Sequence, residues 1–417
     1  LFTLYISINA CDSWINPFSL FFATFSLFIF SRVVLTSIFQ YGDYTKGDWF
    51  FYGHFTIGTR IKLIWLLILF MLAYGLGIQS KAKRIDSKEF KLAPNLDIQK
   101  IGLLFFSISF PFFVFRQLTS FLVIFNYGYI GSHMQAINYS NPIINILASF
   151  FYMGFFLYMS GVPSKRNSLI IFIVFVLCSG LSLFQGSRGE FFSLLLAALW
   201  VFLYVSNYKF GFLKALLIGF LLIFIADFTG YIRNGVLPDH LFGFTTIFDF
   251  LYSQGVSILV PGTTIQFADH FSMVDGFHSL FSQFQLIFQN LIGHHGSYTI
   301  ETATKSWDLS HKLAYFLNKN LYLSGSGLGT SFLAEMYLTG GLLGVFIITF
   351  LFSISFRWFY FIALKSNLLF FVFAFTLTAI LFIPRGSMFY FFVPLYKSLV
   401  AMLLILLFYN IKKKIVE

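Results

Sequence analysis

The chain has 417 residues, of which 58% are hydrophobic and only 10% charged, and its formal net charge is +11. This composition cannot provide a water-soluble surface, so it excludes a soluble globular domain and predicts a polytopic membrane protein. The sequence has no basic-aromatic nucleic-acid motif, and its positive charge is better explained by membrane topology, so nucleic acid is not an expected partner.

Ten apolar runs approach the roughly 20 residues that a helix needs to cross about 30 Å of hydrocarbon. They lie at 17–36, 57–78, 101–118, 142–162, 168–184, 191–206, 211–230, 331–355, 366–383 and 389–409. Residues 1–11 are a candidate for part of an eleventh, and no cleavable signal peptide is evident. We therefore expect an all-α polytopic integral membrane protein with about 10–12 transmembrane helices.

The basic residues indicate which side of the membrane each connection occupies, because cytoplasmic loops carry an excess of Lys and Arg. Fifteen of the 27 basic residues fall in connections on one side: Lys81, Lys83, Arg84, Lys88, Lys91, Lys100, Lys165, Arg166, Lys209, Lys214, Arg357, Lys365, Lys412, Lys413 and Lys414. The C-terminus is therefore expected in the cytoplasm. The outer connections are then 37–56, 119–141, 185–190, 231–330 and 384–388.

One outer connection, 231–330, is much longer than an ordinary loop and is expected to have a structure or function of its own. The amphipathic, aromatic patches Phe242–Tyr252 and Phe277–Ile292 predict short interfacial helices, which could form a lid. The expected organisation is N-terminal membrane helices at 1–230, a long periplasmic loop at 231–330, and C-terminal membrane helices with a basic tail at 331–417.

The turn Gln185–Glu190 places an arginine and a glutamate between two apolar runs. Charge toward the hydrocarbon is costly unless it is paired or faces water, so ionisable groups at this depth are functional candidates. Arg188 and Glu190 are therefore the first residues that the sequence singles out.

Arginine has a different distribution from lysine in this chain. Six of the nine arginines lie in spans or on the outer side: Arg32, Arg60, Arg116, Arg188, Arg233 and Arg385. Guanidinium is always charged and grips phosphate or carboxylate through a planar fork, so these residues indicate an anionic ligand at the outer face. Arg188, Arg233 and Arg385 are the stronger candidates, because each lies beside glycine at a helix end. The others have structural alternatives, namely reaching lipid headgroups or pairing inside the bundle.

A glycine-rich segment, Leu323–Phe332, leads into the eighth span, with Glu335 one turn inside it. Such a segment exposes backbone N–H groups at a helix N-terminus, which favours anions, whereas a dinucleotide-binding motif would need a βαβ context that is missing here. Glu335 has two readings: a first-turn carboxylate matched to the helix dipole, or a base or sugar-hydroxyl contact. Later glycines are expected at close helix contacts: Gly340, Gly341 and Gly344.

The order of these features resembles that of the O-antigen polymerases, the Wzy-type repeat-unit polymerases. The shared features are Ile15–Pro17 opening a span that carries Arg32, the turn 186–189, the long outer loop, Gly327–Tyr337 with Gly340 and Gly341, and Arg385 near the last span. The resemblance implies a multi-pass glycosyltransferase of the bacterial inner membrane, with its active site facing the periplasm and an architecture related to the O-antigen ligases. It would transfer a growing glycan from undecaprenyl pyrophosphate onto the next lipid-linked repeat unit. The implied partners are that oligosaccharide, membrane lipid and, as a candidate, a chain-length-regulating co-polymerase.

This chemistry agrees with the charges in the sequence, because preorganised cations stabilise a pyrophosphate leaving group and a base assists the acceptor hydroxyl. The catalytic candidates are Arg188, Arg233, Arg385, Glu335, His294, His295 and His311. The substrate-binding candidates are Arg116, Glu190, Gly325, Gly327 and Gly329, and Glu190 is also a candidate base. Outer acids are scattered without an Asp-x-Asp pair, so we expect metal-independent catalysis and no cofactor.

Three alternatives remain open from the sequence. An O-antigen ligase would share the fold and the outer loop and would differ in its acceptor. A flippase or exporter of lipid-linked oligosaccharide would also need basic groups at a cavity, but it should show internal repeats and more balanced loops. A purely structural membrane protein is the third.

Overall fold

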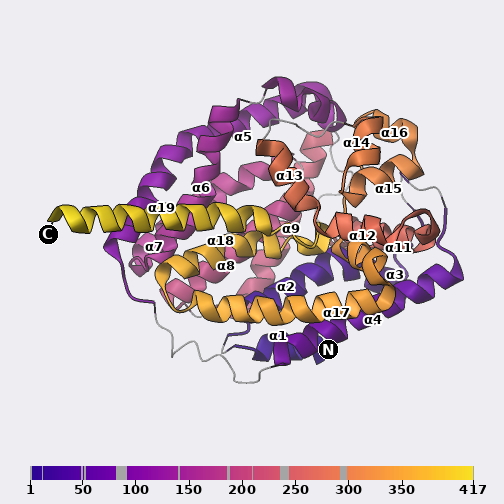
Figure 1. The fold of residues 1–417 in the computed structure, drawn as a ribbon, viewed down its shortest axis with the longest axis horizontal. Coiled ribbons are helices and arrows are strands. Elements are labelled where there is room, and N and C mark those ends of the chain that lie inside the picture. Colours follow the sequence, from indigo (N-terminus) through magenta and orange to yellow (C-terminus); the bar gives the residue numbers. More distant parts are fainter. Residues whose placement is uncertain are drawn as a thin grey trace.

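The computed structural model describes residues 2–11, 13–47, 50, 53–80, 92–139, 141–185, 188–208, 210–234, 244–291 and 298–416. Within these ranges the chain forms helices and no β-strand. Long helices form a bundle, and short helices gather at one end of it (Figure 1). The expectation of an all-α polytopic membrane protein is confirmed.

The bundle follows the apolar runs of the sequence. Its helices are α1 (Phe2–Asn9), α2 (Pro17–Phe25), α3 (Ser31–Phe39), α4 (Ile57–Gln79), α5 (Leu96–Tyr139), α6 (Pro142–Ser160), α7 (Lys165–Gly180), α8 (Arg188–Ser206), α9 (Phe212–Asn234), α17 (Phe332–Ala363), α18 (Asn367–Ile380) and α19 (Phe392–Val416). Among the described residues, eight helical segments are long and apolar enough to cross a membrane, and Leu217–Thr229 and Phe392–Leu407 are shorter apolar helices. These ten segments coincide with the ten expected spans. Helix α1, with eight residues, is too short to cross alone.

Most of one expected outer connection, 119–141, is helical. Residues 119–139, expected to lie in an outer loop, continue α5 as helix, which runs to Tyr139 and contains Pro111. The end of an apolar run marks where hydrocarbon could end, and the expected outer position of 119–141 stays a prediction. A helix ends only where its backbone groups find other partners.

Helix α2 lies in an aromatic core that fixes the first span. Asn16 caps the helix by accepting hydrogen bonds from the next turn, and Pro17 occupies its first position. Phe21 stacks on Tyr74 of α4 with ring centres 5.1 Å apart, and Phe25 stacks on Phe70 at 4.3 Å. A π-helical turn at Ser26–Phe30 then joins α2 to α3, and such turns are frequent at functional sites.

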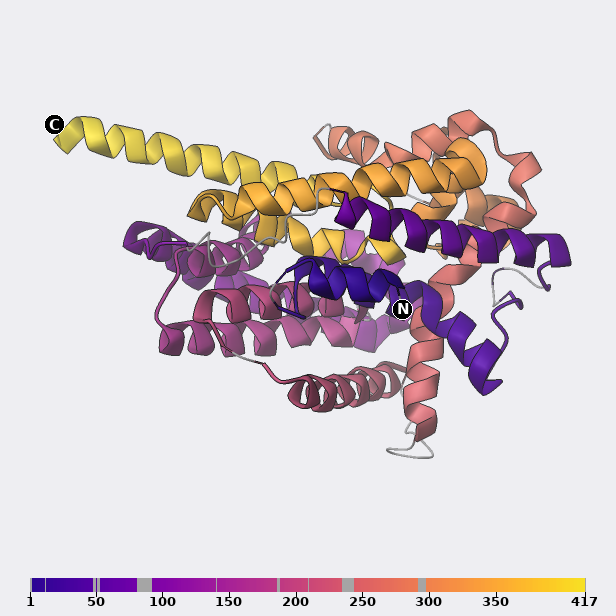
Figure 2. The same ribbon diagram turned by 90° about the horizontal axis from the view of Figure 1, so that it is seen from below.

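Connections that were expected in the cytoplasm meet at one end of the bundle. The Asn367 side chain donates hydrogen bonds to the carbonyls of Ala93, at 2.8 Å, and Ser160, at 2.6 Å. Gln99 donates to the Gly161 carbonyl at 2.8 Å. The C-terminus projects beyond this end, whereas the short helices α11 to α16 lie at the other (Figures 1 and 2). The connections expected on one side of the membrane are therefore grouped at one end of the bundle.

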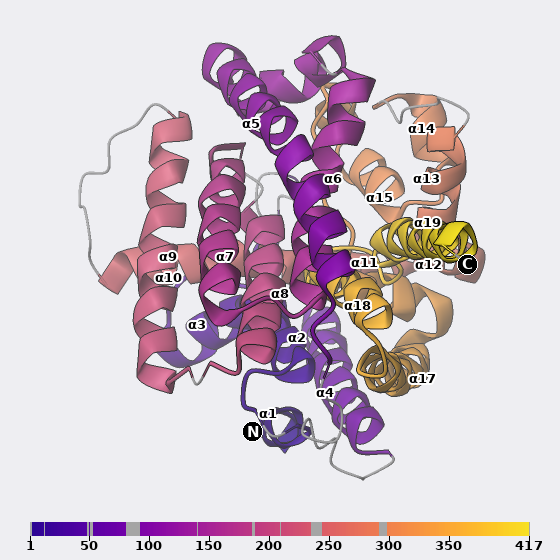
Figure 3. The same ribbon diagram turned by 90° about the vertical axis from the view of Figure 1, so that its left-hand side faces the viewer.

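The long outer segment folds into short helices. They are α10 (Phe244–Gln254), α11 (Leu259–Gln266), α12 (Met273–Leu280), α13 (Ser282–Leu291), α14 (Ile300–Lys305), α15 (Leu309–Leu317) and α16 (Lys319–Leu323). The two amphipathic patches are helical, the first in α10 and the second in α12 and α13. Helix α9, which leads into this segment, lies at the edge of the bundle (Figure 3).

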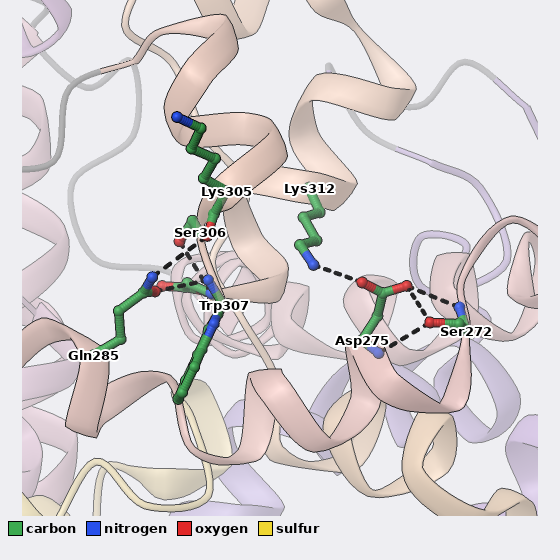
Figure 4. A network of polar contacts seen from close by, with 8 residues as sticks. Ser272, Asp275, Gln285, Lys305, Ser306, Trp307 and Lys312 are labelled. Atoms are coloured by element: carbon green, nitrogen blue, oxygen red, sulfur yellow. Dashed lines mark hydrogen bonds and ion pairs between the residues drawn. The ribbon is translucent and has the colours of Figure 1, made fainter.

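Polar contacts join these short helices to one another (Figure 4). Lys312 of α15 donates to the Asp275 carboxylate of α12 at 2.5 Å, and the Gln285 side chain accepts from the Trp307 backbone at 2.7 Å. Burial alone would raise the pKa of Asp275, but hydrogen bonds from Lys312 and Ser272 hold it below its ordinary value. The outer helices are therefore cross-linked into a unit above the bundle end.

Candidate functional site

The turn between α18 and α19 places Arg385 against the start of α8. Arg385 Nη1 donates to Gln254 Oε1 at 2.8 Å, and its guanidinium lies 5.7 Å from the centre of the Phe28 ring in the π-helical turn. Gly189 lies beneath it, because a Cβ atom built there would be 3.0 Å from Arg385 Cδ. A larger residue at 189 would displace the arginine. The structure thus brings together two of the polar turns that the sequence singled out.

Beside this contact is a cavity of about 260 Å³ among α5, α6, α8, α18 and α19. Its polar lining residues are Arg116, Gln117, Tyr152, Ser182, Gln185, Glu190, Thr378, Tyr390 and Lys397. The Glu190 side chain is exposed, and the charges of both Arg385 and Arg116 act on it. We call Arg385, Gly189 and Glu190 the cavity rim. Two expected substrate-binding residues, Arg116 and Glu190, therefore share one cavity.

The α5 side of the cavity is held by packing and by an amide pair. The Arg116 guanidinium lies 5.6 Å from the centre of the Phe113 ring, one turn earlier in α5. The Gln185 side chain donates to that of Gln117, which joins the 3₁₀ turn before α8 to α5. Because these contacts orient the polar side chains toward one volume, that volume can receive a polar or charged ligand within the bundle.

Glu335 is fully buried, with 0% of its surface exposed, at the start of α17. Its carboxylate oxygens accept from the hydroxyls of Ser279 at 3.2 Å, Thr330 at 3.0 Å and Ser387 at 3.2 Å, and from the Met388 backbone N–H at 2.8 Å. These donors come from α12, from the glycine-rich segment and from the Arg385 turn. Glu335 therefore joins three parts of the structure and is closed to solvent.

Helix α17 breaks one turn after Glu335. Gly340 and Gly341 have non-helical backbone angles, and Gly341 combines φ of 60° with ψ of −150°, a conformation that only glycine adopts readily. The expectation that these two glycines allow close helix packing was wrong, because a Cβ at either would meet no atom within 4 Å. The close contact is instead made by Gly276, where a Cβ would be 2.5 Å from the Thr339 backbone nitrogen. The break leaves Phe332–Thr339 as a short helix under α12.

His311 lies in a different polar region, among the short helices. Its Nδ1 is 3.0 Å from the Tyr322 hydroxyl, and the Tyr298 ring centre is 5.7 Å from the imidazole. Tyr315 packs edge-on to Tyr322, with ring centres 5.7 Å apart. Burial lowers the pKa of His311 below its ordinary value, although the negative charge of Asp308 acts to raise it. We call Tyr298, His311, Tyr315 and Tyr322 the outer aromatic cluster.

The glycine-rich segment runs beside the outer aromatic cluster. Gly325 has a positive φ of 91°, and Gly327 faces Tyr298, with a built Cβ 3.2 Å from that ring. A Cβ at Gly329 would meet nothing within 4 Å. None of these three glycines lines the cavity of the bundle, so the structure separates them from Arg116 and Glu190.

The remaining predicted residues have different positions. Arg188 begins α8, and its charge acts on Asp227 of α9. Arg233 lies near the end of α9, in a turn whose side chains are outside the described part, and His294 and His295 are also outside the described residues. The role of each stays a prediction.

Two other arginines that the sequence singled out, Arg32 and Arg60, contact the outer connections. Arg32 is 3% exposed, its Nε donates to the Tyr252 carbonyl at 3.2 Å, and its guanidinium lies 4.0 Å from the centre of the Tyr252 ring. Arg60 Nε donates to the Phe55 carbonyl at 2.9 Å, beside the start of its own helix. Both therefore hold outer connections to the bundle.

Sequence reasoning missed several residues of the site. Gln254, which is 3% exposed and accepts from Arg385, has no motif around it. Tyr152 and Tyr390 are common residues in this aromatic-rich chain. Lys397 did give a signal, because it is a charged residue inside an apolar run, and such residues are functional candidates.

Comparison with known proteins identifies a family. A family model described as O-antigen polysaccharide polymerase Wzy matches residues 1–414, which is essentially the whole chain. No curated protein and no solved structure matches it. The family assignment therefore rests on a match that includes both the cavity rim and the outer helices.

Proposed function

We propose, since the chain belongs to the O-antigen polysaccharide polymerase Wzy family, that it transfers a growing glycan from undecaprenyl pyrophosphate onto the next lipid-linked repeat unit. Family membership makes it a membrane enzyme of polysaccharide biosynthesis that acts on lipid-linked oligosaccharide repeat units. The observation that best supports the finer proposal is that Arg116 and Glu190 line one cavity among the spans, and that the charge of Arg385 also acts on Glu190. A cavity at that place suits substrates whose lipid part stays in the bilayer.

In the proposed reaction, the bond between the sugar anomeric carbon and the pyrophosphate oxygen breaks, and the oxygen keeps the electron pair. The acceptor hydroxyl oxygen forms the new glycosidic bond and releases its proton. Arg385 would stabilise the departing pyrophosphate, because it is held by Gln254 in a fixed position beside the N-terminus of α8. A preorganised donor of this kind typically contributes about 10²–10³-fold in rate.

Glu190 is the carboxylate among the residues that line the cavity, and we propose that it accepts the proton of the acceptor hydroxyl. Its exposure permits contact with a substrate, and the charges of Arg385 and Arg116 act on it from two sides of the site. Arg116 would bind the substrate on the α5 side of the same cavity. The proton would pass to Glu190 as the new bond forms.

We propose that the reaction is independent of metal because arginines can supply the positive charge that pyrophosphate needs. Among the described residues, no three or more His, Cys, Asp or Glu side chains form a group that could hold a metal ion. Elongation that continues in the presence of a strong chelator would support this part of the proposal, and elongation restored only by added divalent cation would contradict it.

For Glu335 we propose a positioning role. A base must reach the acceptor, but Glu335 is enclosed and accepts four hydrogen bonds, two of them from Ser387 and Met388. The Phe332 backbone N–H also donates to the Gly386 carbonyl at 2.8 Å. Glu335 and the start of α17 would therefore hold the 384–388 turn so that Arg385 stays in place against Gly189 at the start of α8.

We also propose that the site faces the periplasm of a bacterial inner membrane. Support comes from the basic connections and C-terminus at one end of the bundle and the folded outer segment at the other. A reporter that is active only outside the cytoplasm should be active when fused after Gly276 and inactive when fused after Ser87. Reversed activities would contradict the orientation.

Deletion of the chain in its host tests the polymerase function. Loss of a polymerase should leave surface polysaccharide with single repeat units, visible on a gel, and the intact chain should restore long polymers. Loss of all repeat units from the surface would indicate a flippase. Full-length polymer that accumulates but stays on its lipid carrier would indicate a ligase.

A further inference from the structure

Lys397 is a charged residue for which the reaction described above has no use. It lies in the apolar stretch Phe392–Leu407 of α19 and lines the same cavity as Arg116 and Glu190. Its side chain is exposed, and within the described part of the chain it has neither a hydrogen bond nor an ion pair. An ammonium group is costly in an apolar helix unless it reaches water or an anion.

Lys397 lies near the start of α19, at the end of that helix that follows the Arg385 turn. It follows Phe392 by five residues, and at 1.5 Å per residue this places its backbone about 8 Å along the helix. A lysine there could extend to the membrane surface, but this one lines a cavity that also contains Arg116 and the tyrosines Tyr152 and Tyr390. Two cations and two phenols make a set of donors for a multiply charged oxyanion.

A repeat-unit polymerase needs two such anion sites, because it joins two lipid-linked molecules and each carries a pyrophosphate. This step rests on the proposed function. Arg385 lies beside the start of α8. It is the cation that we assign to the pyrophosphate of the donor, which leaves during the reaction. The charges of Arg385 and Arg116 both act on Glu190. The carboxylate is therefore influenced by one cation of the donor site and one cation of the acceptor site.

We propose that Lys397 and Arg116 bind the pyrophosphate of the acceptor, the incoming lipid-linked repeat unit, at the α5–α19 side of the cavity. The acceptor pyrophosphate keeps its bonds throughout the reaction, so these two residues bind it without taking part in bond cleavage. Phosphate could also come from the headgroup of a membrane phospholipid. The polyprenyl pyrophosphate is the ligand that we assign, because the donors line a cavity between spans rather than the outer surface of one helix.

The test counts pyrophosphate ligands on the purified full-length chain in nanodiscs, with a fluorescent farnesyl pyrophosphate as the probe. The wild type should bind two molecules per chain. Lys397→Met should bind one with unchanged affinity and the second roughly tenfold to a hundredfold more weakly, the range expected for loss of one charged hydrogen bond. Lys397→Arg should keep two. Lys214→Met serves as the matched control, because Lys214 is an exposed lysine in an apolar helix away from the cavity.

Several results would overturn the assignment. They are one bound probe in the wild type, two equal sites in Lys397→Met, or loss of the second site in the control variant as well. Competition by phosphatidylglycerol in the nanodisc that disappears in Lys397→Met, with probe binding unchanged, would assign the lysine to a phospholipid headgroup instead.

Polymer formation from a lipid-linked repeat unit is measured separately on the same wild-type preparation. Two bound probes without polymer would argue against the proposed function and leave the second anion site standing. Polymer formation by the wild type, with unaltered probe binding in Lys397→Met, would support the proposed function and argue against the assignment of Lys397 to a second anion site.

Discussion

The cavity rim and the outer aromatic cluster are both polar, but their side chains are satisfied in different ways. In the outer aromatic cluster, His311 and Tyr322 bind each other at 3.0 Å and the surrounding rings pack around them. At the cavity rim, Glu190 is exposed and lines an open volume with Arg116. Groups that satisfy one another stabilise a fold, whereas charged groups that share an open volume can bind a ligand. The difference predicts that substitutions at the rim impair chemistry and those in the cluster impair stability.

The largest effect is expected from Arg385→Lys. A lysine cannot reproduce the planar fork of donors or keep both the Gln254 contact and a grip on phosphate, so elongation should fall by about a hundredfold or more. Elongation of a lipid-linked repeat unit by purified protein at equal membrane abundance is the measurement. Arg60→Lys is the matched control, since Arg60 contacts only the Phe55 carbonyl among the contacts described for it, and it should elongate normally. Full-length polymer from Arg385→Lys would assign Arg385 to anchoring of its turn.

The next effect is expected at Gly189, which touches Arg385 but carries no polar side chain. Gly189→Leu should push the Arg385 side chain out of place and lower elongation by roughly tenfold, because small misplacements of catalytic groups are costly. Gly219→Leu puts the same side chain into α9 where a Cβ meets nothing within 4 Å, and it should have little effect. Equal losses in both variants would show that the effect comes from helix packing rather than from Arg385.

Glu335→Gln should change stability as well as activity. Glutamine has one acceptor oxygen, so two of the four donors around Glu335 would be left unsatisfied in a buried site, at a cost of roughly 1–3 kcal/mol. Thermal unfolding in detergent should show the loss, and elongation should fall mainly in kcat while KM for the lipid-linked substrate stays near the wild-type value. Wild-type stability with complete loss of elongation would instead indicate that Glu335 is a base.

The smallest effect on elongation is expected from His311→Gln, because His311 lies in the outer aromatic cluster and does not line the cavity. Its lowered pKa means that the folded protein binds fewer protons than the unfolded chain, so stability should decrease as the pH falls below about 6.5. His311→Gln should weaken this pH dependence of the unfolding temperature. Loss of elongation in the variant at neutral pH, with stability preserved, would return His311 to the list of catalytic residues.

The spans and many of the special residues were predictable from local sequence. Ten apolar runs became ten helical segments, and Asn16–Pro17 begins the first span as capping chemistry requires. The continuation of α5 through 119–139 was not predictable, because hydropathy shows where a chain can be in hydrocarbon and not where its helix ends. Gly340 and Gly341 were recognised as unusual, but sequence cannot tell a glycine that allows close packing from one that breaks a helix.

For the candidate site, the sequence alone determined which residue types were out of place: Arg188, Glu190, Arg385 and Glu335 are charged at the ends of apolar runs, where charge needs a reason. Only the tertiary structure decided which of them meet. Arg385 contacts Gln254 and Gly189 from positions 131 and 196 residues away in the chain, and no local pattern encodes contacts at that separation. Burial also separated two carboxylates that look alike in sequence, since Glu190 is exposed at a cavity and Glu335 is enclosed by four donors. Exposure and partners depend on how helices pack, and packing is a property of the whole fold.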